Sequence, residues 1–209
     1  MRVNSHSGCR RYFELLSRSI GKIPFDQVDA VVDLLLKTYH SQHTIFVFGN
    51  GGSAALASHF ACDLGKGTVH GSGKRFRVMA LTDNVPLMTA WANDTNYENI
   101  FSEQLANFAI AGDLAFAISG SGNSLNVLRA LELAKQCGMT TTGLAGFSGG
   151  RMRDLCDACI VVPCDNMQII EDLHVSIAHS LFTCIRARLC DAAFPPVLRP
   201  HLVKRAAER

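Results

Sequence analysis

The sequence predicts an α/β fold: a doubly wound, five-stranded parallel sheet flanked by helices. Short apolar runs recur along the chain, and they alternate with segments whose apolar residues lie three and four positions apart, which is the spacing of a helix. Two of the runs open into loops rich in glycine and serine. Strands that alternate with helices pair in parallel through right-handed crossovers, so one sheet with helices on both faces is expected.

The strands and helices can be placed along the chain from this pattern. Strands are expected at residues 44–48, 77–81, 114–118, 141–144 and 159–162. Helical spacing is found at residues 11–40, 54–64, 85–93, 101–108, 125–137 and 168–188, and Pro24 and Asp26 suit the start of a helix within the first of these. We expect a single domain over residues 1–209, with N-terminal helices at 8–41, a core at 44–190 and a C-terminal tail at 191–209.

The composition describes a globular protein and excludes several other classes. Hydrophobic residues make up 48% of the 209 residues and charged residues 18%, which is too apolar for a disordered chain. The formal charge of +2 comes from scattered side chains, whereas nucleic-acid binding usually needs a concentrated basic face. No apolar stretch is long enough to span a membrane, and the polar N-terminus lacks the apolar segment of a signal peptide. A cytoplasmic protein without nucleic-acid or membrane partners is expected.

A cytoplasmic location predicts that the eight cysteines are reduced thiols and not a disulfide framework. Cys156 and Cys159 have the spacing of a metal or redox pair, with Cys164 nearby, but no second pair of that spacing is present. The pair also lies where a strand is expected to begin. A structural role is the preferred interpretation, because a free cysteine is commonly a small buried hydrophobic residue.

The two loops, residues 49–53 (GNGGS) and 119–124 (SGSGNS), have the composition of phosphate-binding loops. Each follows a strand and precedes a helix, so each is expected at the carboxyl edge of the sheet, where ligands bind in folds of this class. Backbone N–H groups and the dipole at a helix N-terminus favour a phosphate, and glycine lets the backbone approach it. Ser119, Ser121 and Ser124 add three hydroxyl donors. Two such loops together predict a phosphorylated ligand.

Two other phosphate motifs fit less well. Gly49, Gly51 and Ala54 match the spacing of a dinucleotide-binding loop, but the acidic residue expected about 20 positions later, at the end of the next strand, is missing there. Asp83 occupies that strand end but lies much farther along. No P-loop sequence is present. A nucleotide site is therefore not the preferred interpretation.

Residues 146–150 (GFSGG) match the GxSxG nucleophile elbow of hydrolases and also follow a strand. A hydrolase would need an acid and a histidine farther along the chain, for which Asp157 and either His174 or His179 are candidates. The motif alone recurs often by chance, and a hydrolase stays an alternative.

His59 and Asp63 lie four residues apart on the helix after the first loop, so both side chains project from one face. That arrangement suits two ligands of one metal ion, and its place beside a phosphate loop favours a functional role. On the last helix Glu171 and His174 share a face, whereas His179 lies about 12 Å along the axis from Glu171. His174 is interpreted as a packed helix histidine.

Five motifs occur in order along the chain: FGNGGSA, NDTNYENIF, AISGSGNS, GLAGFSGGRM and EDLHVSIAH. Together with His59 and His179, they resemble the sugar isomerase (SIS) domain and, within it, the bacterial phosphoheptose isomerases, over about residues 10–190. The resemblance implies a flavodoxin-like SIS fold and a homotetramer with active sites between subunits. It also implies conversion of sedoheptulose 7-phosphate to D-glycero-D-manno-heptose 7-phosphate, a precursor of bacterial surface heptoses.

The resemblance further implies the roles of individual residues. Moving a carbonyl from C2 to C1 takes one proton from carbon and delivers another to oxygen, and the family's base and acid fall on Asp63 and His179. A divalent metal, expected to be zinc, polarises the sugar oxygens; its ligands fall on His59, Asp63, Glu171 and His179. The substrate-binding positions fall on Asn50, Gly51, Gly52, Ser53, Asp63, Asn93, Asp94, Ser119, Gly120, Ser121, Ser124 and Glu171.

The chain departs from the family at several of these positions. Asp63 replaces a glutamate, which moves the carboxylate by about 1.5 Å. Glu171 replaces a neutral glutamine, which raises affinity for a divalent metal and lowers its Lewis acidity. Lys66 stands near the place of a frequent arginine, and Ser148 stands where the family has an acidic residue, which weakens the nucleophile-elbow interpretation.

These departures keep a non-catalytic alternative open. SIS proteins that bind a phosphosugar, or that associate with the bacterial replication initiator, keep the fold and the loops without the metal residues. The set of His59, Asp63, Glu171 and His179 favours the enzyme. A sugar-binding SIS regulator is a third alternative, but the chain has no DNA-binding module.

Overall fold

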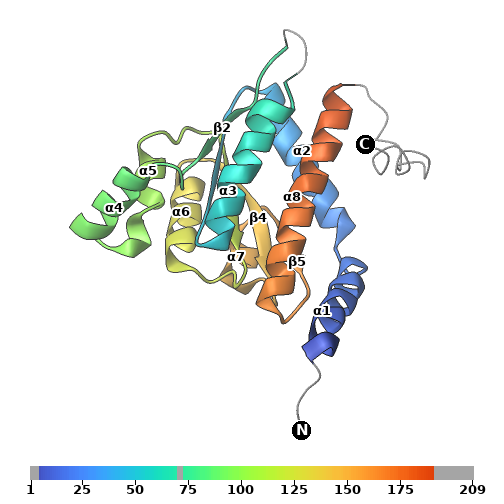
Figure 1. Cartoon of the computed structure of the whole chain (residues 1–209). Coiled ribbons are helices and arrows are strands. Elements are labelled where there is room, and N and C mark those ends of the chain that lie inside the picture. Colours follow the sequence, from blue (N-terminus) through green and yellow to red (C-terminus); the bar gives the residue numbers. More distant parts are fainter. Residues whose placement is uncertain (1–4, 70–72, 191–209) are drawn as a thin grey trace, which may run out of the picture.

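The computed structural model describes residues 5–69 and 73–190, in which one sheet is covered by helices on both faces (Figure 1). The strands are β1 (Thr44–Gly49), β2 (Arg77–Ala80), β3 (Leu114–Ser119), β4 (Thr140–Gly146) and β5 (Ala158–Val162). Each pairs in parallel with its neighbour, in the order β2-β1-β3-β4-β5. This is the flavodoxin-like order. The doubly wound parallel sheet and its five expected strands are confirmed, while the expected tail at 191–209 lies outside the described residues.

The helices follow the predicted pattern, with differences at their ends. They are α1 (Ser5–Ile20), α2 (Phe25–His40), α3 (Gly52–Cys62), α4 (Val85–Asp94), α5 (Ser102–Ala106), α6 (Leu125–Gln136), α7 (Gly150–Leu155) and α8 (Met167–Leu189), with a π-helix η1 (Asp63–Gly67) and a 3-10 helix η2 (Tyr97–Asn99). The helical spacing at 11–40 belongs to two helices, because α2 begins anew directly after Pro24. The short α7 had no counterpart among the expected helices.

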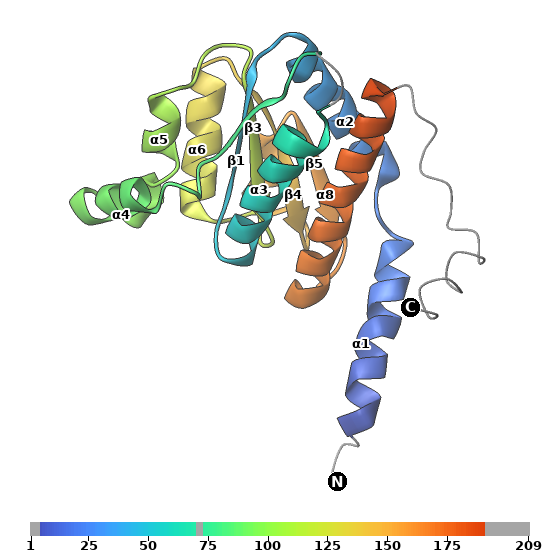
Figure 2. The same cartoon turned by 45° about the horizontal axis from the view of Figure 1, so that its top comes forward.

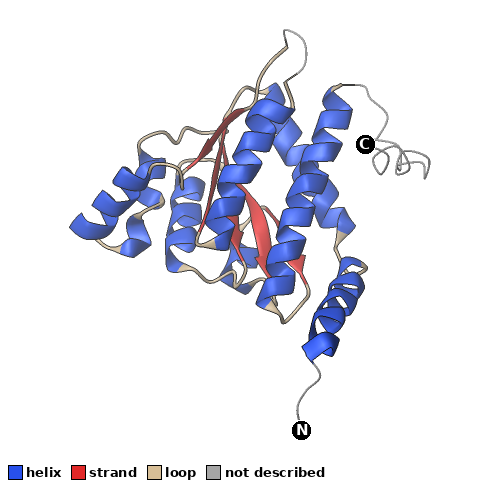
Figure 3. Cartoon of the chain, viewed as in Figure 1, coloured by secondary structure: helices blue, strands red, loops and turns tan. Residues whose placement is uncertain are grey.

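Helices lie on both faces of the sheet (Figure 3), and the apolar side chains between them and the sheet form two clusters, one on each face. Along β1, Ile45 and Val47 face the cluster formed with α2, α3 and α8, while Phe46 and Phe48 face the cluster formed with α5, α6 and α7. Strands buried on both faces need continuous apolar runs, which explains why the strand segments are apolar throughout. Cys159 lies in the second cluster as a free thiol, and the structural role predicted for it agrees with this position.

Helix α1 projects from the body of the molecule (Figure 2). It contacts α8, and one of the contacts is a side-chain hydrogen bond. Tyr12 Oη donates to Asp172 Oδ2 over 2.6 Å, and the carboxylate raises the pKa of Tyr12 to about 12. Phe13, on the same helix, is 66% exposed. Among residues 5–69 and 73–190, no helix is both long and apolar enough to cross a bilayer.

The strand register brings the carboxyl ends of the central strands together. Gly49 pairs with Ile118, and Ser119 pairs with Ala145, so the loops after β1, β3 and β4 leave the same edge of the sheet. Gly122 adopts φ +65°, and a Cβ there would lie 2.0 Å from the Gly149 carbonyl oxygen. Only glycine allows the loops after β3 and β4 to pack this closely. The loops at the edge of the sheet that the sequence predicted as the binding site are therefore packed closely against one another.

Candidate active site

The loop after β3 has the features of a phosphate site. Ser119 Oγ and Ser124 Oγ lie 3.2 Å apart, and Ser121 Oγ accepts from the Asn123 backbone N–H. Ser124 directly precedes the first turn of α6, whose free N–H groups and dipole favour an anion. The hydroxyls of this loop therefore lie at the N-terminus of α6, and phosphate binding there stays a prediction.

The loop after β1 leads into a second helix N-terminus. Gly51 adopts φ +55° immediately before α3, whose first residues are Gly52 and Ser53. Ser53 is almost fully buried, with 8% of its surface exposed. The side chain of Asn50 lies between the two loops, where it is hydrogen-bonded to Asn126 of α6. The two glycine- and serine-rich loops therefore lie side by side at one edge of the sheet.

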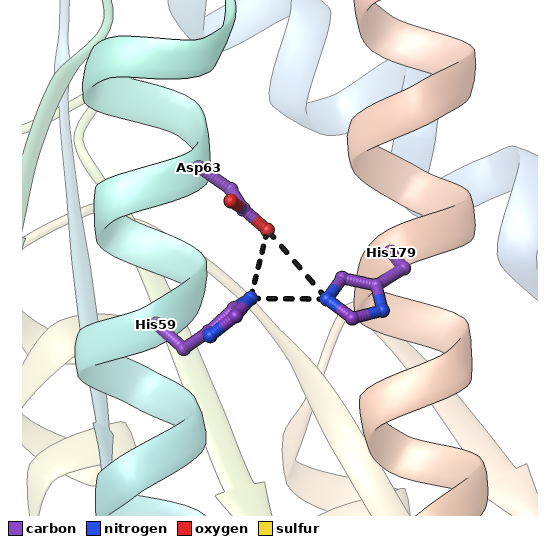
Figure 4. A group of neighbouring side chains, drawn as sticks. All are labelled: His59, Asp63 and His179. Atoms are coloured by element: carbon purple, nitrogen blue, oxygen red, sulfur yellow. Dashed lines mark hydrogen bonds and ion pairs between the residues drawn. The ribbon is translucent and has the colours of Figure 1, made fainter. Parts of the chain in front are cut away.

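Three of the four predicted metal ligands meet between α8 and the far end of the helix that follows the first loop (Figure 4). His59 Nε2 lies 3.0 Å from His179 Nε2 and 3.3 Å from Asp63 Oδ2, and His179 Nε2 lies 4.0 Å from the same carboxylate oxygen. His59 comes from α3, Asp63 from the first residue of the π-helix η1, and His179 from α8. The change of helix type at Asp63 is of the kind that often marks a functional site.

The geometry of this triad fits a divalent metal. A tetrahedral zinc with ligand bonds of 2.0–2.1 Å places neighbouring ligand atoms about 3.3 Å apart, close to two of the three distances observed. Asp63 Oδ2 is buried and accepts no hydrogen bond. A buried carboxylate oxygen without a donor is costly unless a cation or another partner satisfies it. Two imidazole nitrogens and this oxygen form a set of ligands that zinc prefers.

Glu171 takes a different position from the triad. A Cβ on Gly52 would lie 3.2 Å from Glu171 Oε1, so the carboxylate lies against the first residue of α3. The N-terminal dipole of α3 favours a negative charge there. Within the described chain, the group whose ligand atoms all lie within 4.8 Å comprises His59, Asp63 and His179 without Glu171.

Asn93 and Asp94 are the last two residues of α4, and Asn93 Nδ2 donates to Asp94 Oδ1 over 2.8 Å. The segment after them reaches the first loop through Tyr97, whose hydroxyl donates to Asn50 Oδ1 over 2.9 Å. Tyr97 and Asn126 are contacts of the site that the sequence did not predict. Tyr97 belongs to the motif NDTNYENIF, but no periodicity or spacing relates it to a loop 47 residues away.

His174 is the packed helix histidine that the sequence favoured. Only 1% of its surface is exposed, and it borders a cavity of about 200 Å³ with Ser53 and Glu171. Burial lowers the pKa of His174 to about 4, although a hydrogen bond with the Ala145 backbone acts in the opposite direction. The imidazole is therefore neutral near pH 7.

The buried His174 predicts a loss of stability in acid. Its pKa is about 4 when folded, against 6.5 for the free group, so the unfolded chain binds more protons between these values. The stability that the neutral, buried His174 contributes is complete above pH 6.5. As the pH falls towards 4, the free energy of unfolding decreases by about 3 kcal/mol. Urea unfolding across this range should show a steeper pH dependence for the wild type than for His174→Leu. Equal slopes would contradict the prediction.

A hydrolase triad does not form around Ser148. Asp157 Oδ2 accepts from both the backbone N–H and the hydroxyl of Thr141, and it is not paired with a histidine. His174 Nε2 has no partner, and His179 belongs to the triad with His59. Within the described residues, the acid and histidines nominated for a nucleophile elbow are engaged elsewhere.

Comparisons with known proteins agree with this geometry. The family model for the SIS domain matches residues 11–146, which is more than half of the chain. A phosphoheptose isomerase from Helicobacter pylori strain Shi470 is 40% identical over 154 residues, covering 74% of this chain and 80% of that protein. A phosphoheptose isomerase from Geotalea daltonii is 38% identical over 171 residues, covering 82% and 88%.

Solved structures show the same relationship. The phosphoheptose isomerase from Neisseria gonorrhoeae superposes with a TM-score of 0.81 at 29% identity, over 87% of this chain and 98% of that one. The phosphoheptose isomerase from Francisella tularensis superposes with a TM-score of 0.81 at 27% identity, over 88% of this chain and 99% of that one. Sequence identity, coverage and fold agree, and we conclude that this chain belongs to the phosphoheptose isomerase family of SIS-domain enzymes.

Proposed function

We propose that this isomerase converts sedoheptulose 7-phosphate to D-glycero-D-manno-heptose 7-phosphate, the reaction of the family it resembles. The observation that carries the proposal is the convergence of His59, Asp63 and His179 from α3, η1 and α8, in a chain that also has two loops suited to a phosphate. A ketose phosphate needs both parts: a site that holds its phosphate, and an acid–base pair at its carbonyl end. A phosphosugar-binding protein without catalysis would need only the loops.

In the proposed reaction the phosphate is bound by Ser53, Ser119, Ser121 and Ser124, and the sugar extends towards α3 and α8. Asp63 takes the proton from the carbon next to the carbonyl, and His179 moves a proton at the sugar oxygens. The remaining substrate contacts are proposed at Asn50, Gly51, Gly52, Asn93, Asp94, Gly120 and Glu171. General acid–base catalysis of this kind contributes about 100- to 10,000-fold to the rate.

A divalent ion, which we propose to be zinc, would be held by His59, Asp63 and His179. Glu171 lies beside Gly52 and about 12 Å along α8 from His179, so it would complete the set by reaching inward or from another subunit. When bound, the ion supplies Lewis-acid polarisation of the two sugar oxygens between which the carbonyl moves. The support for the site is the short distances between the three ligand atoms and the unsatisfied Asp63 oxygen.

We also propose a homotetramer with sites between subunits. In support of it, the projecting helix α1 carries several exposed apolar side chains: Phe13 is 66% exposed, Ile20 48% and Leu15 40%. Residues of this kind gather on surfaces that bury against another chain. Light scattering on the purified protein tests the proposal, and a monomer would contradict it.

The function is tested by incubating the purified protein with sedoheptulose 7-phosphate and following the products by nuclear magnetic resonance. A new heptose phosphate is expected, and a chelator is expected to slow its formation. No conversion with or without added zinc, together with tight binding of the sugar phosphate, would support the non-catalytic alternative instead.

A further inference from the structure

The amide of Asn50 is held by three hydrogen bonds from different parts of the chain. Asn126 Nδ2 donates to Asn50 Oδ1 over 2.8 Å, and Asn50 Nδ2 donates back to Asn126 Oδ1 over 2.9 Å. Tyr97 Oη donates to Asn50 Oδ1 over 2.9 Å. Asn50 lies in the loop after β1, and Asn126 lies in the first turn of α6, directly after the second loop. The amide pair therefore joins the two loops.

These bonds fix which way the Asn50 amide points. The Val127 backbone N–H donates to Asn126 Oδ1, which identifies that atom as the acceptor of the pair. Both lone pairs of Asn50 Oδ1 are then used, one by Asn126 and one by Tyr97. One of the two Asn50 N–H groups is also used, so a single N–H donor is left. Asn50 can offer a ligand a donor and no acceptor.

Tyr97 is held in place by α6 as well. Arg129, on α6, pairs with Glu98, and its Nη1 donates to Asn99 Oδ1 over 2.6 Å. Glu98 and Asn99 are the residues that follow Tyr97 in the 3-10 helix η2. Asn126 is thus part of α6, and Tyr97 belongs to a short helix that is hydrogen-bonded to α6. Both donors to Asn50 Oδ1 are therefore positioned by α6. Tyr97 itself is 57% exposed, so the core does not depend on it.

We propose that Tyr97 and Asn126 are positioning residues for substrate binding, which hold Asn50 so that its free N–H donates to an oxygen of the bound sugar phosphate. The inference rests on the proposed function for the identity of the ligand. Without these bonds the amide can rotate and present its carbonyl oxygen, which cannot donate to a sugar carbonyl and is repelled by its lone pairs. The proposed phosphate contacts are Ser53, Ser119, Ser121 and Ser124, and the Asn50 side chain is hydrogen-bonded to Asn126 and Tyr97 instead.

Tyr97→Phe tests the inference with little disturbance to the fold. Removal of one hydrogen bond is expected to raise KM for sedoheptulose 7-phosphate about five-fold and to change kcat much less. The affinity for inorganic phosphate, measured by calorimetry, is expected to stay the same. Tyr39→Phe is the matched control, because it also removes a hydroxyl that donates over 2.8 Å, here to the Lys74 carbonyl before the amino end of β2.

A double-mutant cycle tests whether the two residues act through Asn50. If they do, the loss of affinity in Tyr97→Phe with Asn126→Ala is smaller than the product of the two single losses. An unchanged KM in Tyr97→Phe, an equal change in Tyr39→Phe, or an equal loss of affinity for inorganic phosphate would overturn the inference.

Calorimetry with sedoheptulose 7-phosphate separates this inference from the proposed function. If the wild type binds this compound without converting it, the isomerase proposal fails, while a weaker affinity in Tyr97→Phe still supports the positioning role. If the wild type does not bind it at all, both fail.

Discussion

Asp63→Asn is expected to lower kcat for sedoheptulose 7-phosphate by about 100- to 10,000-fold. The substitution keeps the shape of the side chain and removes the basic oxygen that takes the proton from carbon. Asp63 Oδ2 is the atom that lies near both imidazoles, at 3.3 Å from His59 Nε2 and 4.0 Å from His179 Nε2. Steady-state kinetics with zinc present measures the effect, and far-ultraviolet circular dichroism checks the fold.

Two further variants make the result specific. Asp33→Asn makes the same chemical change at an exposed ion pair with Arg188, and it is expected to leave turnover unchanged. Asp63→Glu introduces the glutamate that the phosphoheptose isomerase family has at this position, and the variant is expected to retain turnover. If Asp63→Asn kept more than about a tenth of the wild-type kcat, the role as base would be ruled out.

His59→Ala is expected to release the divalent metal and to abolish most of the activity. Replacement of residues that only support metal ligands already costs about 10- to 100-fold in affinity or activity, and loss of a ligand costs more. The side chain of His59 is 52% exposed, so the substitution leaves the core intact. Elemental analysis of the purified protein gives a readout that does not depend on turnover.

His40→Ala is the control for this prediction, because His40 is an exposed histidine at the end of α2. It precedes the start of β1 and so lies at the amino edge of the sheet, whereas the two loops lie at the carboxyl edge. It is expected to keep the metal content of the wild type. Equal zinc content in His59→Ala and the wild type would show that the triad is not the metal site. Activity that survives complete removal of zinc by a chelator would show that the acid–base pair suffices.

The structure changes how the Glu171 departure is understood. From the sequence alone, a carboxylate in place of a glutamine is expected to strengthen metal binding. In the fold it lies against Gly52, where the N-terminus of α3 stabilises its charge. Its negative charge is then close to the first loop, where a phosphate would be repelled. Of the four proposed phosphate contacts, Ser119, Ser121 and Ser124 in the loop after β3 are therefore expected to contribute more than Ser53, with the sugar nearer to Glu171.

Local sequence patterns were sufficient for the sheet. Each strand appears as a continuous apolar run because both of its faces are buried, and the intervening helices show their own spacing. Helix ends were less well predicted: the α-helix expected to reach residue 64 ends at Cys62 and continues as a π-helix. The turn around Gly149 and the short α7 depend on packing of the loops, which leaves no periodic signal in so few residues.

The sequence by itself determined the alternation of strands and helices, the two phosphate-type loops, and the pairing of His59 with Asp63 on one helical face, because each depends on residues within a few positions of one another. The family resemblance grouped His179 with this pair, but only the tertiary structure shows that its ring reaches His59 from 120 residues away. The tertiary structure also decided that Asn50 is held by Tyr97 and Asn126. The physical reason is that contacts between distant segments are set by the order and register of the strands, which bring together loops that no local pattern relates.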